Sequence, residues 1–535
     1  MKKILIIGGG INGAGIARDA ALRGWDVTLL EMNDFCSGTS WASSKLIHGG
    51  LRYLEHGEIN LVRESLRERE TLLRIHRHNI QPLHLLLAVY RHSPHRLTTL
   101  RLGMKMYEFL SEKRSLPVHE FYTEDQLNTI EPGLDKRKLQ GGIAYWDAQC
   151  IYPERLVIAN LHTAEENGAE LHNYHKVIRL NMKSGRIVSV LAMNILNGEE
   201  KEFEADMVVN ATGPWIDTLL QKDMASHRPL IGGTRGSHIM IPKFADGPRH
   251  AIYVNARLDG RPFFILPWRN YYLVGTTDVR HTDTLEELSP TYAEIDYLIT
   301  ETNHCFPSAE LDRNKILFSF SGVRPLPFST KKNPGAITRR HLIIDHAKHD
   351  GIANLVSLIG GKLTTYRHMA EQVVDLIGLK SAQTKAPCST AGTPLWGGGM
   401  DSADAFVSQE IANAEKLYSI DEKTLRHLVT LYGTHYREVL NTDPTQVNGP
   451  EAVCPHSTDI RAQIVFAVRH EWAKKLADVM FRRTPIGMNV CFGMDACEKT
   501  AEIMGNELGW NEKKRQEEIQ DYRKYVTDRL LSHKS

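Results

Sequence analysis

A glycine-rich turn near the N-terminus most constrains what this chain can fold into. Residues 4–24, ILIIGGGINGAGIARDAALRG, predict a short buried strand, a turn carrying Gly8-x-Gly10-x-x-Gly13, and a helix that ends at Gly24. In such a turn Gly8 permits a sharp reversal, Gly10 lets the backbone approach a pyrophosphate, and Gly13 lets the helix pack closely on the strand. The pattern therefore predicts a dinucleotide-binding unit whose helix N-terminus receives a pyrophosphate.

The segments that follow favour a flavin over a nicotinamide. The second strand, DVTLLE, ends at Glu31, where a carboxylate can accept hydrogen bonds from ribose hydroxyls. A nicotinamide domain would then continue with another strand and helix. This chain continues instead with SGTSWASSKLIHGG at residues 37–50, whose hydroxyls and exposed backbone amides suit a phosphate and a planar ring. The alternatives are a glycine-rich turn without a ligand and a solvated loop.

Length and composition exclude several classes of protein. The 535 residues are too many for one compact core, so two or three domains are expected. A hydrophobic content of 42% and a charged content of 24% are typical of a soluble globular protein. The net charge of +1 gives no global attraction for nucleic acid, so no nucleic-acid partner is expected. No run of 18 apolar residues occurs, and MKKILIIGGG predicts a first strand, not a signal peptide.

The cysteines predict neither a disulfide framework nor a cysteine-type zinc site. Their number, seven, is odd, and none of them form a CxxC pair, which fits a reducing compartment. A second candidate metal cluster, built from the histidines and the aspartate of residues 341–349, fits no common ligand spacing. We therefore expect no metal.

Further patterns outline the organisation of the chain. Residues 58–78 predict an amphipathic helix with Ile59, Val62, Leu66 and Leu73 on one face. The remaining segments predict hairpins at 177–209 that return to the main sheet, four strands of a second, antiparallel sheet at 238–277, and a strand, glycine turn and helix at 354–378.

A domain boundary is expected at residues 385–404, which are rich in glycine, proline, serine and threonine. Beyond it the chain is predicted to be helical. In residues 461–483 an apolar stripe that includes Ile464, Trp472 and Val479 recurs at helical spacing.

Several longer segments resemble a known family, in that family's order. They are IIGGGINGAGIARDAALRG, SSKLIHGGLRYLE, VVNATGPW, GSHIMIP, GTTDV, SGVRPL and GGKLTTYR, and they extend over most of residues 4–370. Together they resemble the FAD-dependent glycerol-3-phosphate dehydrogenases of the aerobic, membrane-associated type. The helical C-terminal part resembles the same family less specifically.

The resemblance implies an α/β fold. It consists of a Rossmann-like FAD-binding domain, an antiparallel-sheet substrate domain as in glutathione-reductase-like and D-amino-acid-oxidase-like flavoproteins, and an all-helical C-terminal domain. The flavoprotein core would span residues 1–390 and the helical domain residues 391–535. Within the core, the FAD-binding segments would lie near 1–80, 150–220 and 340–380, and the substrate segments near 81–149 and 221–339.

The resemblance also implies an activity. It is the oxidation of sn-glycerol 3-phosphate to dihydroxyacetone phosphate, with hydride transfer to non-covalent FAD and electron transfer to a membrane quinone, in glycerol catabolism and respiratory electron supply. Two alternatives stay open, an oxidase of the same substrate that uses oxygen, and a non-catalytic flavin-binding subunit of a larger complex. A homodimer is possible.

This chemistry needs a base and a phosphate site. A general base must remove the hydroxyl proton, and His48 and His238 are the candidates, with His48 favoured. The alternative for either histidine is that it only forms a hydrogen bond with the substrate or the backbone. A phosphomonoester needs cations, and three lie in separate glycine-flanked family motifs. We assign catalytic roles to His48, His238 and Arg324, and substrate binding to Arg52, Tyr53, His238, Thr277, Arg324 and Lys362.

The expected cofactor contacts come from the glycine turn, the loop after Glu31, the NATG turn and the GGKLTT turn. In the last of these, Thr364 or Thr365 is the expected N-cap of a helix whose positive end would face the flavin. The assigned residues are Gly8, Gly10, Asn12, Gly13, Glu31, Thr39, Ser40, Ser44, Lys45, His48, Gly49, Ala211, Thr212, Gly213, Gly361, Lys362, Leu363 and Thr364.

A basic and leucine-rich stretch at residues 91–114 is a candidate membrane contact. Arg91, Arg96, Arg101 and Lys105 alternate there with leucines and methionines, as in segments that rest on anionic lipid, or as on an ordinary helix face. With the family resemblance, this stretch predicts a cytoplasmic protein that is peripheral on the inner face of the cytoplasmic membrane.

Overall fold

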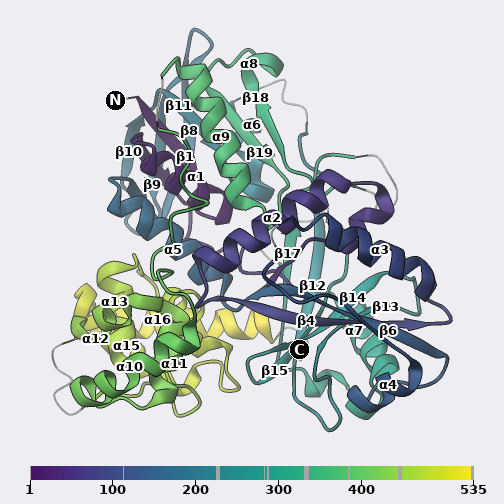
Figure 1. Ribbon diagram of the computed structural model, residues 1–535. Helices are drawn as coiled ribbons and strands as arrows, with labels where there is room; N and C mark the ends of the chain where they lie inside the picture. Colours follow the sequence, from purple (N-terminus) through teal and green to yellow (C-terminus); the bar gives the residue numbers. More distant parts are fainter. Residues whose placement is uncertain are drawn as a thin grey trace.

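The computed structural model describes residues 2–112, 114–223, 229–281, 284–285, 288–329, 337–383, 386–443 and 449–531. It shows a largely parallel sheet, a large mixed sheet and a helical C-terminal part (Figure 1). No helix in these ranges is long and apolar enough to cross a membrane.

The first sheet has six strands in the order β18-β19-β11-β1-β2-β7. Neighbouring strands pair in parallel except for β18, which is antiparallel to β19. The strands are β1 (Lys3–Ile7), β2 (Asp26–Leu30), β7 (Glu170–His172), β11 (Met207–Asn210), β18 (Leu342–Asp345) and β19 (Leu355–Ile359). This order brings β1 between β2 and β11, so the carboxyl ends of these strands meet at one edge.

Helices cover this sheet where the sequence predicts them. Helix α1 (Ile11–Leu22) follows the glycine turn and packs against α5 (Pro153–Glu166) and α9 (Tyr366–Ser381). The approach of α1 to α9 is close, because a Cβ on Gly15 would lie 2.7 Å from the ring of Tyr366. The predicted strand, turn and helix at both ends of the core are confirmed.

A separate antiparallel sheet, ordered β10-β9-β8, lies beside the first. It consists of β8 (His175–Lys183), β9 (Arg186–Asn194) and β10 (Glu200–Glu204), after which β11 re-enters the parallel sheet. The predicted hairpins that return to the main sheet are confirmed.

The second large sheet has ten strands and is antiparallel except where β13 pairs with β4. The predicted strands of residues 238–277 are confirmed as β12 to β15. Its members are β3 (Leu46–Ile47), β4 (Ile80–Tyr90), β5 (Glu120–Tyr122), β6 (Leu139–Cys150), β12 (Thr234–Pro242), β13 (Ala251–Asn255), β14 (Pro262–Trp268), β15 (Tyr271–Gly275), β16 (Val279–Arg280) and β17 (Phe318–Arg324).

Helix α2 (Ile59–Ile75) confirms the predicted amphipathic helix, which is shorter than expected at both ends. Val62, Leu66 and Leu73 are buried, but Ile59 is 42% exposed because it is the first residue of the helix and projects beyond the core. The other helices of the core are α3 (Leu97–Phe109), α4 (Glu124–Ile130), α6 (Ile216–Asp223), α7 (Tyr292–Cys305) and α8 (His346–His349).

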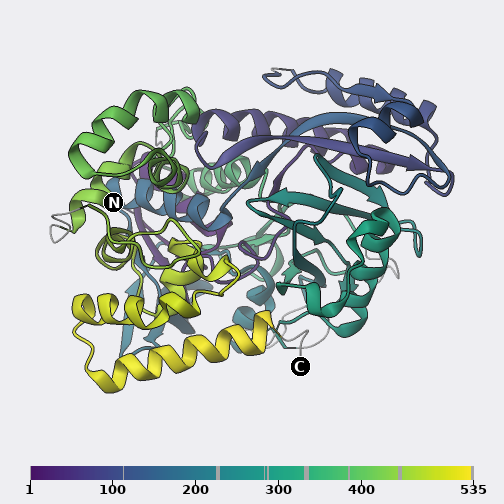
Figure 2. The ribbon, with the colours of Figure 1, turned by 90° about the horizontal axis from the view of Figure 1, so that it is seen from below.

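The C-terminal part is helical, as predicted. Helix α16 runs along the lower edge of the molecule in Figure 2 and continues into a π-helical turn, Val526–Leu530, that contacts β17. Position 385, where the expected boundary begins, lies outside the described residues. The helices are α10 (Ala403–Tyr418), α11 (Glu422–Tyr432), α12 (Tyr436–Thr442), α13 (Arg461–His470), α14 (Leu476–Asp478), α15 (Cys497–Leu508) and α16 (Glu512–Tyr525).

The helical spacing of the apolar stripe in residues 461–483 does not correspond to one continuous helix. Helix α13 ends at His470, and Trp472 adopts a left-handed backbone conformation with a φ of 57°. The break directs the buried carboxylate of Glu471 to Arg155 on α5, at 2.7 Å. A tertiary ion pair therefore overrides the local helical periodicity.

A buried ion cluster joins the C-terminal part to the loop after β2. Asp34 accepts hydrogen bonds from Arg482 Nε at 2.5 Å and from the two terminal nitrogens of Arg483 at 2.8 and 2.7 Å. Asp34 is 1% exposed and Arg483 is fully buried. Burial alone would raise the pKa of Asp34, but the charges of Arg483 and Arg482 hold it below its usual value. The cluster fixes the chain just beyond Glu31.

We predict that Asp34→Ala destabilises the whole protein. The buried Arg483 would lose its carboxylate partner and Arg482 would keep only Asp478, and breaking a buried ion pair in this way costs about 3–5 kcal/mol. Thermal unfolding of the FAD-loaded protein should show a clearly lower midpoint. Asp296→Ala is the matched control, because Asp296 pairs with Arg313 at an exposed site worth less than about 1 kcal/mol. Equal midpoints for the two variants would contradict this role of Asp34.

Candidate active site

The glycine turn brings three backbone segments into direct contact. Gly8 has a φ of +111°, and a Cβ there would lie 2.6 Å from the carbonyl oxygen of Ala211. A Cβ on Gly13 would lie 1.9 Å from the carbonyl oxygen of Gly8. Ser40 Oγ accepts the Ile11 N–H at the start of α1, at 2.9 Å. The turn therefore has the close backbone approach that a pyrophosphate requires, at the N-terminus of α1.

Glu31 directly follows β2 and faces this turn. Its Oε2 accepts the Gly9 N–H at 2.7 Å, and its Oε1 accepts the Asn33 N–H at 2.9 Å. Burial raises the pKa of this carboxyl, and the two backbone N–H groups partly oppose the effect. A carboxylate held at this strand end is placed to accept ribose hydroxyls.

The remaining predicted cofactor segments converge on the same edge of the parallel sheet. A Cβ on Gly361 would lie 3.8 Å from the side-chain amide of Asn12. The preceding Gly360 donates its N–H to the carbonyl of Pro325 at 2.7 Å, and Leu363 is half-buried against the core. In the NATG turn, the Thr212 hydroxyl donates to Asn210 at 2.7 Å. These narrow, backbone-lined surfaces fit FAD.

Two predicted cofactor residues direct their side chains elsewhere. Thr39 Oγ1 donates to the carbonyl of Val323 at 2.7 Å. The Lys45 side chain is buried, with its Nζ 3.5 Å from Glu154 and 5.0 Å from the centre of the Trp268 ring. Any contact of Thr39 or Lys45 with the cofactor therefore depends on the backbone, and both assignments stay predictions.

The expected N-cap of α9 is confirmed in position but not in its hydrogen bond. Thr365 occupies the N-cap position, but its side chain makes no capping hydrogen bond. Thr364 instead joins two site loops, because its Oγ1 accepts the His48 N–H at 3.1 Å and lies 3.4 Å from the His48 carbonyl. The hydroxyl thus positions the His48 loop and leaves the backbone amides of the turn open.

The two candidate bases differ in their surroundings. The imidazole of His48 makes no hydrogen bond with the described residues, whereas His238 Nε2 lies 2.8 Å from Ser44 Oγ. His238 also stacks on Phe320, with ring centres 5.0 Å apart. Burial lowers the pKa of each histidine to about 3, and the charges of Lys362 on His48 and of Arg324 on His238 act in the same direction. Both imidazoles are therefore neutral near pH 7.

A group of four cations, Arg52, Arg324, Arg339 and Lys362, surrounds Tyr53, and we call it the cation cluster. The charges of the three arginines act on the Tyr53 hydroxyl, whose pKa is raised by burial. The Lys362 Nζ lies 3.9 Å from the centre of the Tyr53 ring. Three members come from the sequence prediction, and Arg339 was missed because no motif surrounds it.

One carboxylate organises part of the cation cluster. Asp278 binds Arg324 at 3.2 Å and Arg339 at 2.8 Å. Arg324 also donates to Thr276 Oγ1 at 2.9 Å and to the carbonyl of Thr277 at 3.3 Å. Burial and the charge of Arg339 lower the pKa of Arg324 to about 10, although Asp278 opposes them. Sequence reasoning missed Asp278, which stands in the GTTDV motif.

Lys362 forms no ion pair within the described ranges, although it has one hydrogen bond. Its Nζ donates to Ser65 Oγ on α2 at 3.0 Å. Burial lowers its pKa to about 7, in spite of the opposing charges of Glu64 and Glu58. Arg52 makes no hydrogen bond or ion pair with the described residues. The cluster therefore carries more positive than negative charge, and it is suited to an anion.

Thr277 does not direct its hydroxyl to this cluster. The hydroxyl donates to Glu294 on α7 at 2.7 Å and accepts the Ser237 N–H at 2.9 Å. Only its carbonyl reaches the cluster, through Arg324. A substrate contact by Thr277 stays a prediction.

Sequence reasoning also missed a buried network behind the His48 loop. Asp147 accepts hydrogen bonds from Arg69 at 2.6 Å, from the Tyr107 hydroxyl at 2.9 Å and from the Gly49 N–H at 3.3 Å. A Cβ on Gly49 would lie 2.3 Å from the Tyr107 oxygen. This network holds the backbone beside His48 in one position.

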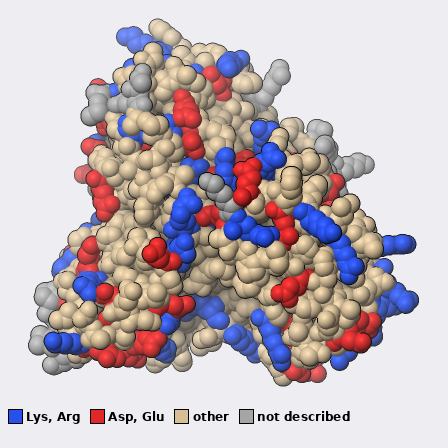
Figure 3. All heavy atoms as spheres, viewed as in Figure 1, with Lys and Arg blue, Asp and Glu red and all other residues tan. Residues whose placement is uncertain are grey.

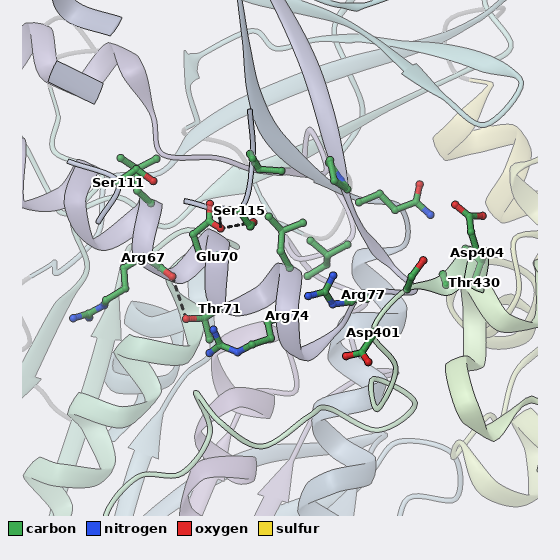
Figure 4. A pocket seen from close by; sticks show the side chains of 18 of the residues that line it. Arg67, Glu70, Thr71, Arg74, Arg77, Ser111, Ser115, Asp401, Asp404 and Thr430 are labelled. Atoms are coloured by element: carbon green, nitrogen blue, oxygen red, sulfur yellow. Dashed lines mark hydrogen bonds between the residues drawn. The ribbon is translucent and has the colours of Figure 1, made fainter. Parts of the chain in front are cut away.

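A cavity of about 990 Å³ lies on the other side of α2, between that helix and the C-terminal helices (Figure 4). Its walls carry Arg67, Arg74 and Arg77 from the α2 region, together with Asp401 and Asp404 from the C-terminal part. None of the predicted site residues line it. The candidate active site is therefore formed by the loops at the sheet edges and not by this cavity.

Two family models match most of the chain. Residues 3–376 match a family model described as FAD dependent oxidoreductase. Residues 388–515 match one described as the C-terminal domain of alpha-glycerophosphate oxidase.

Similar full-length proteins carry a common description. The chain is 40% identical to a glycerol-3-phosphate dehydrogenase of Synechocystis sp., over 99% of this chain and 97% of that protein. It is 32% identical to an aerobic glycerol-3-phosphate dehydrogenase of Staphylococcus aureus, over 95% and 91%. The crystal structure of the glycerol-3-phosphate dehydrogenase from Bacillus halodurans, complexed with FAD, matches with a TM-score of 0.79 and 27% identity, over 99% and 95%. The chain therefore belongs to the glycerol-3-phosphate dehydrogenase family of FAD-dependent oxidoreductases.

Proposed function

We propose that this protein oxidises sn-glycerol 3-phosphate to dihydroxyacetone phosphate and passes the electrons to a membrane quinone. The observation that carries the substrate assignment is the cation cluster, which lies beside the flavin-facing loops and has one carboxylate, Asp278, ion-paired to it. A phosphomonoester carries nearly two negative charges at neutral pH. Arginine forks that are already oriented by Asp278 suit its oxygens.

In this proposal His48 removes the hydroxyl proton. Its imidazole makes no competing hydrogen bond with the described residues, and burial lowers its pKa, so the ring is unprotonated before the substrate arrives. His238, held by Ser44, hydrogen-bonds the substrate, while Tyr53 and the cation cluster hold the phosphate. FAD, when bound non-covalently, supplies the acceptor for the hydride that leaves the carbinol carbon.

An oxidase that uses oxygen is the second candidate. It is favoured by the description of the model that matches residues 388–515, which names an alpha-glycerophosphate oxidase. The two full-length relatives described above, both named dehydrogenases, favour the quinone acceptor.

The two acceptors are distinguished by product analysis. With glycerol 3-phosphate in air, we expect the purified FAD-loaded protein to reduce a soluble quinone analogue faster than it forms hydrogen peroxide. Peroxide formed in proportion to the substrate consumed, with the quinone present, would identify an oxidase. Omission of substrate is the control for background reduction.

Arg324→Ala tests the phosphate site. Truncating one partner of a buried charge pair costs about 2–5 kcal/mol, which corresponds to a loss of roughly 30- to several-thousand-fold in kcat/KM for glycerol 3-phosphate. Activity on unphosphorylated glycerol should change far less, and FAD content should stay the same. Arg324→Lys should recover only part of the loss, because a point charge does not reproduce the fork.

Arg313→Ala is the matched control for this experiment. Arg313 pairs with Asp296 at an exposed site and should leave kcat/KM unchanged. Equal losses on both substrates for Arg324→Ala would assign Arg324 to the chemistry or the fold. An unchanged kcat/KM would remove it from the site.

We further propose that α3 rests on the membrane surface, on the cytoplasmic side. Leu102, Met106 and Phe109 follow one another along this helix and are 71%, 37% and 82% exposed. Arg101 and Lys105 are exposed beside them. Figure 3 shows basic side chains gathered over α2 and α3. An apolar stripe with flanking positive charges suits an anionic lipid surface.

Phe109→Glu should weaken membrane binding. Burying an exposed aromatic side chain contributes about 1.5–3 kcal/mol. The variant should therefore bind vesicles with an affinity at least about tenfold lower than that of the wild type. Co-sedimentation with vesicles that contain anionic lipid measures this, and high salt should release the wild type. Leu379→Glu, on the exposed side of α9, is the control because Leu379 is 81% exposed and lies outside the stripe. Wild type that stays in the supernatant at low salt would refute the proposal.

A further inference from the structure

Two loops of the C-terminal part bring four metal-binding side chains together. Cys454 and His456 lie between α12 and α13, and Cys491 and Asp495 lie just before α15. The donor atoms of His456, Cys491 and Asp495 all lie within 4.8 Å of one another. Cys454 Sγ lies 3.5 Å from Cys491 Sγ, and His456 Nε2 lies 3.1 Å from Asp495 Oδ2.

We propose that these four residues bind one zinc ion. Two thiolates, an imidazole and a carboxylate are donors that Zn²⁺ takes in tetrahedral sites, and ligand atoms there lie roughly 3.3–3.8 Å apart. Both measured separations are close to that range. Within the group of His456, Cys491 and Asp495 the donors need to contract by no more than about an ångström to reach it, and Cys454 Sγ joins them from beside Cys491.

The backbone conformation of each loop brings its two side chains together. Phe492 and Gly493 both have positive φ values, 51° and 66°, and the turn they make places Cys491 and Asp495 on one side. In the other loop, the backbone N–H of His456 donates to Cys454 Sγ, which holds the two side chains of this loop near each other. His456 and Asp495 are about half exposed, so an ion can enter from solvent.

The ion would fix the junction between the C-terminal part and the large sheet. Next to Cys491, Asn489 accepts a hydrogen bond from Arg269, in the turn between β14 and β15, at 2.7 Å. The carbonyl of Phe492 accepts the Tyr522 hydroxyl of α16 at 2.6 Å. The expectation that the cysteines form no zinc site is based on the absence of a CxxC pair. That spacing rule misses donors that come from two loops 35 residues apart or more.

Zinc titration of the full-length, FAD-loaded protein tests the proposal. After treatment with a chelator and in the presence of a reductant, the protein should take up one tight equivalent of Zn²⁺ against a chromophoric competitor and unfold at a higher temperature. The double variant Cys454→Ser/Cys491→Ser should lose affinity by about a hundredfold or more. Cys388→Ser is the matched control, since its thiol contacts Thr390 and Arg367 instead.

Asp495→Asn keeps the test decisive if the double variant fails to fold. This exposed side chain should be replaceable without unfolding, and its loss as a charged ligand should weaken Zn²⁺ binding by about tenfold or more. Three results would each overturn the proposal. They are the absence of a tight equivalent in the wild type, unchanged binding in Asp495→Asn, and a Cys454–Cys491 disulfide, seen as the loss of two hydrogens, in protein isolated without a reductant.

Discussion

The contact of bare backbone at Gly8, Gly13 and Ala211 is the constraint on which the site depends. No side chain fits between these segments, since a Cβ on Gly13 would lie 1.9 Å from a carbonyl oxygen. Because β1 lies between β2 and β11, this contact places the start of α1, Glu31 and the NATG turn close to one another. Strand β19, next to β11, adds the loop with Gly361 and Lys362 at the same edge. The parallel order of the strands thus gathers residues that are far apart in the sequence.

Much of the fold could be predicted because local periodicity and turn chemistry decide it. The glycine turn, the hairpins and the antiparallel strands are examples. The site was less predictable, because a motif locates a loop without showing which way each side chain points. Lys45 is buried against Glu154 and Trp268, and the Thr277 hydroxyl bonds to Glu294. Arg339 has no motif around it and is recognised only through its distance to Asp278.

The cation cluster is held together against its own repulsion. Burial lowers the pKa of Lys362 to about 7 and that of Arg324 to about 10, which means that the positive charges are costly where they lie. Surrounding structure such as the Asp278 pairs and the Ser65 hydroxyl keeps them in place. An arriving dianion would relieve this repulsion without requiring the arginines to reorient. On the proposed function, some folding stability is given up for a preorganised anion site.

The Asp34 cluster has a consequence for which substitutions the protein can accept during evolution. The loop that carries Asp34 belongs to the segment matching the oxidoreductase model, while Arg482 and Arg483 belong to the segment matching the C-terminal model. Loss of Asp34 would leave Arg483 buried without its carboxylate partner, and loss of both arginines would leave Asp34 buried without an ion pair. A homologue that loses the C-terminal segment would need a neutral residue at position 34. A homologue that acquires a different C-terminal segment would need one that carries its own pair of cations. The two segments are thus bound to change together over evolutionary time.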